Sequence, residues 1–113
     1  MVTAVAEPLH IEVASAALAY DPRTGEPVIS FRMTSSSARA FAELTAHNVG
    51  RKAAILIDGR MVSAPVIREP ILGGSGQVSG HFSPEEARDI ALRLSSGAAK
   101  MEIEIVADDS SGK

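Results

Sequence analysis

The sequence contains no cysteine and no tryptophan, and aromatic residues make up only 4% of its 113 residues. The absence of cysteine excludes disulfides, thiolate metal sites and cysteine catalysis. With so few aromatic rings, the core has to be built from valine, isoleucine, leucine, alanine and methionine. No apolar run approaches the roughly 20 residues of a membrane-spanning helix, so no membrane span is predicted for this chain.

Clustered positive charge is missing as well. The net charge is −3, with acidic and basic residues interspersed, and no basic cluster exceeds Arg51-Lys52. Because a nucleic-acid surface needs grouped cations, we predict no nucleic-acid partner. A chain of 113 residues that is 45% apolar is typical of one globular domain with a single core.

No catalytic or metal-binding motif is present. His10, His47 and His81 are dispersed and form no H-x-x-x-H pair, so no metal site is predicted. The glycines of 73–76 lack the lysine and the following helix that a phosphate-binding loop needs. We therefore predict a non-enzymatic protein without a cofactor. Catalysis would require a pocket that gathers Asp58 with His81 or another histidine.

The first half of the chain predicts a hairpin followed by a helix. Residues 10–20 alternate partly and residues 27–33 alternate as strands do, and the turn residues Asp21 to Gly25 lie between them. An antiparallel hairpin is therefore expected. Apolar residues at helical spacing predict a helix over 36–48, with Gly50 available for a left-handed helix end.

The second half begins with residues 53–57, a continuous apolar run typical of a central strand that is buried on both faces. Asp58-Gly59 predicts a type I′ turn into a returning strand near 61–64. The prolines that follow indicate an edge or irregular segment, and 77–80 is a further short strand candidate.

The strongest local pattern is Ser83 to Glu86, which combines a helix N-cap, a first-turn proline and a capping box. The helix is expected to end at Gly97, and the alternation of 101–106 predicts a last strand. The order β-β-α-β-β-(β)-α-β predicts an α+β sandwich of ferredoxin-like kind. Its two helices are expected on one face of a mostly antiparallel sheet.

The domain is expected to cover 10–107, with disordered segments at 1–9 and 108–113. Ala4-Val5-Ala6 has the small-residue pattern of a signal-peptide cleavage site, which favours an exported protein.

A series of short segments occurs in order along the chain. These segments are Gly25 to Phe31, Phe41 to Thr45, Asn48 to Arg51, Ala54 to Gly59, Ser63 to Ile67, Glu69 to Ile71, Gly73 to Gly76, Ser79-Gly80, Phe82 and Glu85 to Ala87. Over roughly residues 13–98 they resemble the head of the first periplasmic domain of SecD, a subunit of the SecDF protein-export complex.

The resemblance implies a periplasmic domain that engages emerging unfolded preproteins and moves as proton flow through the membrane part drives the cycle. It carries over no catalytic residue. The chain has none of the intramembrane acidic residues that proton coupling needs, so it is not expected to be a motor by itself. A fragment of SecD and a free-standing exported protein both fit, and the polar ending after Val106 favours the second.

The expected contact surface is the glycine- and proline-rich segment 63–82, because loops on a rigid scaffold commonly carry recognition. The candidate polypeptide-binding residues are Val66, Ile67, Ile71, Leu72, Gly73 and Gly74. They would suit an extended peptide, including one that adds as a strand to a sheet edge. Two alternatives stay open. These side chains could close the core under the loop, or the protein could be an inhibitor or regulator that caps one folded envelope protein.

Overall fold

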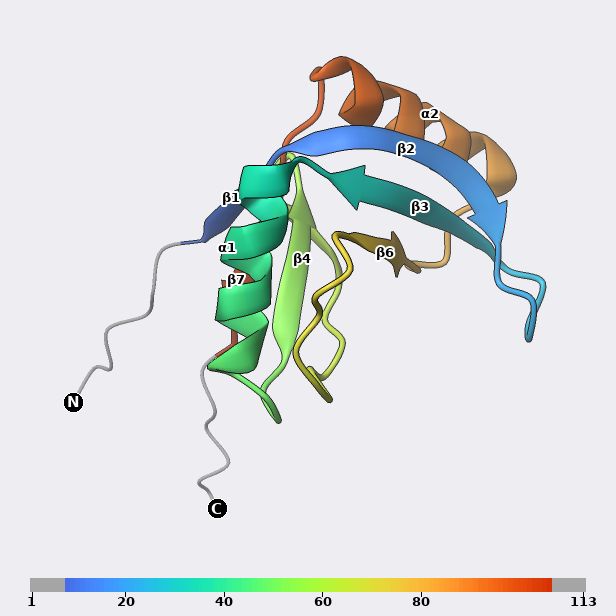
Figure 1. The fold of residues 1–113 in the computed structure, drawn as a ribbon. Coiled ribbons are helices and arrows are strands. Elements are labelled where there is room, and N and C mark those ends of the chain that lie inside the picture. The colour runs from blue at the N-terminus through green and yellow to red at the C-terminus, as the bar shows by residue number, and fades with distance from the viewer. Residues whose placement is uncertain (1–7, 107–113) are drawn as a thin grey trace.

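A computed structural model describes residues 8–106 (Figure 1). The terminal segments predicted to be disordered, 1–9 and 108–113, lie outside the described residues except for Pro8 and Leu9. The described elements are β1 (Leu9–Ile11), β2 (Val13–Tyr20), β3 (Pro27–Met33), α1 (Ser35–Ala46), β4 (Ala53–Ile57), β5 (Arg60–Ser63), β6 (Ser75–Val78), α2 (Pro84–Ser96) and β7 (Met101–Ile105).

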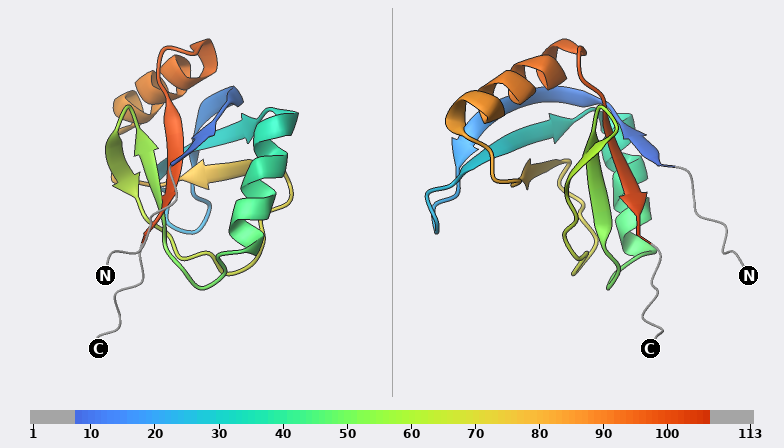
Figure 2. Two further views of the ribbon diagram at one scale, coloured as in Figure 1. Left: turned by 90° about the vertical axis from the view of Figure 1, so that its left-hand side faces the viewer. Right: turned by 180° about the vertical axis from the view of Figure 1, so that it is seen from behind.

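The strands form two antiparallel sheets, in the order β1-β7-β4-β5 and β2-β3-β6. Figure 2 shows β2 and β3 arching across one end of the steeply inclined strands of the four-stranded sheet. The predicted α+β class and the mostly antiparallel pairing are confirmed. The expected single sheet differs from the structure, because the strand predicted over 10–20 divides between the two sheets.

Glu12 is the residue at which the chain crosses from one sheet to the other. Its N–H donates to Ser37 Oγ at 2.8 Å, and its C=O accepts from the Thr34 N–H at 3.0 Å. Both partners belong to the start of α1 or its cap. Since the backbone of Glu12 is bonded to the helix start, it leaves the strand ladder there, and β1 and β2 can pair in different sheets.

The two helices begin and end where local chemistry favours it. The Thr34 side chain caps α1, while Ser83 and Glu86 form the predicted capping box at α2. Gly97 ends α2 in the left-handed conformation at φ 85°. Neither described helix, of 12 and 13 residues, has the length and apolar character that a membrane crossing requires.

The core lies between the two sheets and the helices. Helix α2 packs against β2 and β3, and α1 packs against β1 and β3, so the helices do not share one face of one sheet. Strand β4 is central in its sheet, as its continuous apolar run predicted. Asp58 and Gly59 both have positive φ, 54° and 83°, as a type I′ turn requires.

Candidate functional site

An apolar pocket of about 320 Å³ opens between the two sheets and beside the segment 65–72. Strand β3, helix α1, strands β4 and β7, and the chain from Pro65 to Gln77 all contribute to its wall. Its apolar lining includes Phe31, Phe41, Ala53, Ile55, Ile71 and Ile103. The volume of this pocket is near the lower end of the range for ligand-binding sites. It is large enough to hold a few side chains of a larger partner.

The segment 65–72 is held on the chain that links α1 to β4. The Gly50 N–H donates to the Ile67 C=O at 2.7 Å, and the Ile67 N–H donates to the Arg51 C=O at 2.8 Å. The Ala53 N–H donates to the Pro65 C=O at 2.9 Å. The predicted irregular segment therefore has fixed backbone partners, and it forms a firm wall of the pocket.

A buried threonine holds the far end of the same segment. Thr45 is 0% exposed, and its Oγ1 accepts the Ile71 N–H at 2.9 Å. The hydroxyl donates in turn to the Phe41 C=O at 2.9 Å, within α1. This chain of bonds fixes Ile71 at the pocket wall from inside the core.

The structure places the four apolar candidates in three environments. Val66 and Leu72 are exposed, at 43% and 74%, whereas Ile67 is only 4% exposed and Ile71 is half-buried. Val66, Ile67 and Ile71 line the pocket, and Leu72 lies just beyond it. Ile67 thus closes the core under the segment, while Val66 and Leu72 are accessible to a partner.

The two candidate glycines join the segment to β6. Gly74 has φ +77°, which favours glycine, and its C=O accepts the Met33 N–H at 2.8 Å. Gly73 has open space around the position of a side chain. Gly74 therefore positions β6 beside β3, whereas a side chain at position 73 would meet no neighbouring atom.

Sequence reasoning missed the floor of the pocket. Phe31, Phe41, Ile55 and Ile103 lie in segments predicted as strands or a helix, and none was a candidate site residue. All four are buried. They line one cavity because β3, α1, β4 and β7 meet in the fold. These elements are distant in sequence, so no local pattern predicts the cavity.

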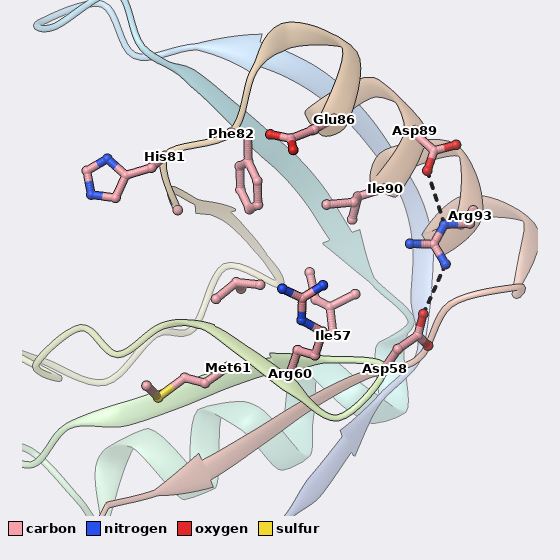
Figure 3. A pocket seen from close by; sticks show the side chains of 12 residues that line it. Ile57, Asp58, Arg60, Met61, His81, Phe82, Glu86, Asp89, Ile90 and Arg93 are labelled. Carbon is pink, nitrogen blue, oxygen red and sulfur yellow. Dashed lines mark hydrogen bonds and ion pairs between the residues drawn. The ribbon is translucent and has the colours of Figure 1, made fainter.

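A second cavity, of about 610 Å³, lies between the β4–β5 hairpin and α2 (Figure 3). Arg93 connects its two walls. Its Nη1 lies 3.1 Å from Asp58 Oδ2, and its Nε lies 3.4 Å from Asp89 Oδ2. The second contact is an ion pair without hydrogen-bond geometry, since Nε is buried and has no hydrogen-bond partner among the described residues. The Asp58–Arg93 pair joins α2 to the hairpin, whereas the Asp89–Arg93 pair lies within α2.

The same cavity contains Asp58 and His81, the pair that catalysis would require, but they lie at opposite ends of it (Figure 3). Both carboxylate oxygens of Asp58 have structural partners, Arg93 Nη1 at 3.1 Å and the Lys100 N–H at 3.0 Å. His10 lies in β1 and His47 caps α1, so neither joins them. Among residues 8–106, no three His, Asp or Glu side chains gather as metal ligands would.

Comparison with known proteins adds a family to this geometry. A family model described as the SecDF P1 head subdomain matches residues 10–101. The chain is 39% identical over 101 residues to the protein translocase subunit SecD of Thermobaculum terrenum, and 41% identical over 101 residues to that of Acetobacter pasteurianus. Each match covers 89% of this chain and 19% of the relative, so the chain spans about a fifth of these relatives.

A solved structure shares the fold as well. A structure of SecDF, described as a membrane component that enhances protein export, superposes with a TM-score of 0.72 at 38% identity. The superposition covers 86% of this chain and 44% of that one. The architecture of two sheets and two helices is therefore that of the SecDF head.

Proposed function

Because this chain belongs to the SecDF P1 head family, we propose that it is the polypeptide-binding head of a protein-export accessory subunit. The P1 head is a periplasmic domain of an inner-membrane protein, which confirms the predicted periplasmic location. In that compartment the abundant unfolded polypeptides are exported proteins that have not yet folded. We propose that such chains are its partners and that no catalysis is involved.

The observation that carries the proposal is the apolar pocket beside accessible apolar side chains. An unfolded chain exposes aliphatic and aromatic groups that a folded protein buries, and transfer of these groups from water into an apolar pocket is favourable. The pocket offers Phe31, Phe41 and Ile103 to an entering side chain, with Val66 at the rim. A weak site of this kind suits a domain that must bind many sequences and release them.

Charge around the rim is mixed, which fits partners of varied sequence. Arg68 and Glu69 line the pocket side by side with opposite charge, and both are exposed. A rim of one sign would select against polypeptide segments of the same sign. Recognition is therefore expected to depend on apolar side chains, with little selection by charge.

The proposal is tested by titrating the labelled domain with a secreted protein kept unfolded by reduction and alkylation of its cysteines. Amide chemical shifts of 65–77 and the methyl shifts of Ile71 are expected to change, and those of α2 to stay in place. Loss of part of one valine contact in Val66→Ser should weaken binding about fivefold. Leu92→Ser, which removes a more exposed apolar side chain on α2, 64% against 43% for Val66, is the control and should bind as the parent does.

Unchanged shifts at 65–77 on saturation with unfolded protein would disprove this site. The comparisons give no support to the alternative, an inhibitor that caps one folded envelope protein. That alternative predicts a single tight stoichiometric complex with a folded partner and no affinity for the alkylated chain, so the same titration separates the two.

A further inference from the structure

Strand β6 is the outer strand of the three-stranded sheet, and among residues 8–106 no strand pairs with its second edge. It pairs antiparallel with β3 in a register that sets Gly76 opposite Phe31 and Gln77 opposite Ser30. The Met33 N–H donates to the Gly74 C=O at 2.8 Å, so these two opposed residues form a hydrogen-bonded pair. In an antiparallel ladder such pairs alternate with pairs that are not bonded to each other.

The alternation determines which backbone groups of β6 point away from the sheet. Gly76 and Val78 bond to β3, because they lie two and four residues beyond Gly74. Ser75 and Gln77 therefore direct their N–H and C=O groups outward. Both residues are exposed, and no hydrogen bond among residues 8–106 joins these groups to a side chain or a loop.

This open edge borders the apolar pocket. Ser75, Gly76 and Gln77 all contribute to the pocket wall. Gly76 carries no side chain, and a Cβ at this position would lie 3.2 Å from Cζ of Phe31. The edge thus runs closely over the aromatic ring at the pocket floor, with no side chain between the backbone and the ring.

Two other outer strands, β5 and β2, have a contact from another segment at one backbone carbonyl each. At β5, the segment around Gly80 approaches so closely that an added Cβ would lie 2.8 Å from the Val62 C=O. At β2, the hydroxyl of Ser95 in α2 donates to the Ala16 C=O at 3.1 Å. The edge of β6 differs from these in being open where it meets the pocket.

We infer that an extended polypeptide binds as an added strand on the free edge of β6, and that every second side chain of it enters the apolar pocket. The inference rests on the proposed function and names the form in which the partner is recognised. The outward groups of Ser75 and Gln77 bond to the peptide backbone, which is common to all sequences. Side chains of a strand alternate between faces, so aliphatic residues at alternate positions give the best ligand.

A first experiment uses peptides and the unmodified domain. The probe is a short acetylated peptide with leucine at alternate positions, threonine between them and a lysine at each end. Two analogues carry N-methyl groups, one on all leucine amides and the other on all threonine amides. In an added strand only one of the two sets faces β6, so one analogue should bind roughly tenfold more weakly and the other about as the parent.

A second experiment changes the edge. Gln77→Pro removes an outward N–H that β3 does not use, and proline is tolerated on the outer side of an edge strand. This variant should bind the unmodified peptide about fivefold to tenfold more weakly, because one bond is lost and the ring blocks the approach. Gln77→Ala keeps the N–H and is the matched control, with affinity within about twofold of the parent. Amide exchange at Gly76 and Val78 reports whether the β3 pairing survives.

The outcomes separate this inference from the proposed function. If the peptide shifts the resonances of 65–77 but both N-methylated analogues bind equally well, strand addition is wrong and the apolar site stands. Equal affinity of Gln77→Pro and Gln77→Ala leads to the same conclusion. If the unmodified peptide does not bind at all, both proposals fail.

Discussion

The carboxylate of Asp58 joins the guanidinium of Arg93 at 3.1 Å across 35 residues of chain, and so ties the β4–β5 turn to α2. The other carboxylate oxygen accepts the Lys100 N–H at 3.0 Å, and the Asp58 N–H donates to the Lys100 C=O at 2.9 Å. One turn residue with positive φ therefore holds three parts of the fold together: the hairpin, the helix and the start of β7.

Two substitutions at this position are expected to differ in cost. Asp58→Asn keeps an acceptor for Lys100 and tolerates the left-handed conformation, so the loss of a half-exposed ion pair should cost only about 0.5 kcal/mol of unfolding free energy. Asp58→Ala also loses the bond to Lys100 and strains the backbone, for a total of about 2 kcal/mol. Urea unfolding measures the loss of unfolding free energy in both variants. Equal losses would contradict the structural role given to the bond between Asp58 and Lys100.

Close packing around Gly80 is expected to make a substitution there destabilising. A Cβ at this position would lie 2.8 Å from the Val62 C=O and 2.9 Å from Cζ of Phe82, so Gly80→Ala must displace the segment from β5. We expect a loss of about 2 kcal/mol in thermal or urea unfolding. Gly73→Ala has open space and is the control, with a change near zero or slightly stabilising. A Gly80→Ala variant as stable as Gly73→Ala would show that the approach is not a constraint.

Substitution of Thr45 is expected to loosen the pocket wall at Ile71. Thr45→Val keeps the shape but removes the acceptor of the Ile71 N–H, so we expect a loss of about 1.5 kcal/mol and faster hydrogen exchange of the Ile71 amide. Thr45→Ser keeps the hydroxyl and loses a buried methyl group, at about 1 kcal/mol, with the amide still protected. Amide exchange followed by NMR distinguishes the variants, and equal protection of Ile71 in both would refute the link.

Loss of the N-cap of α2 is expected to lower the stability of the domain. The Ser83 hydroxyl accepts the Glu86 N–H at 3.1 Å, and the Glu86 carboxylate accepts the Ser83 N–H at 2.9 Å. Ser83→Ala should cost about 1 kcal/mol. Ser36→Ala, an exposed position in the first turn of α1, should stay within about 0.5 kcal/mol of the parent. If the two variants have the same stability, the capping box does not contribute.

Elements with local causes could be predicted from the sequence. The capping box at Ser83 and the turn at Asp58-Gly59 rest on interactions within a few residues, and the continuous apolar run of 53–57 is enough to predict a buried central strand; the structure confirms each. The helix predicted over 36–48 runs from Ser35 to Ala46, because the Thr34 cap starts it earlier and His47 ends it. Local chemistry thus determined the elements and, within about two residues, their bounds.

The arrangement of the elements could not be predicted in the same way. Residues 10–20 alternate partly and predict one strand, yet the bonds of Glu12 to Thr34 and Ser37 divide them between two sheets. The pocket depends on the meeting of Phe31, Phe41 and Ile103, which the sequence reports only as apolar positions. Both features result from contacts between distant segments, on which hydrophobic periodicity carries no information.

Because β7 is the last described strand in the sequence, its position inside the four-stranded sheet affects the order in which the two sheets can assemble. The first described strand, β1, and the central strand β4 both pair with β7, the last described one. A nascent or partly exported chain can assemble β2, β3 and β6 early. In the four-stranded sheet, β1 has no strand partner and β4 has only β5 until Met101 to Ile105 become available. Up to that point the domain exposes unpaired strands of the kind that we propose it binds.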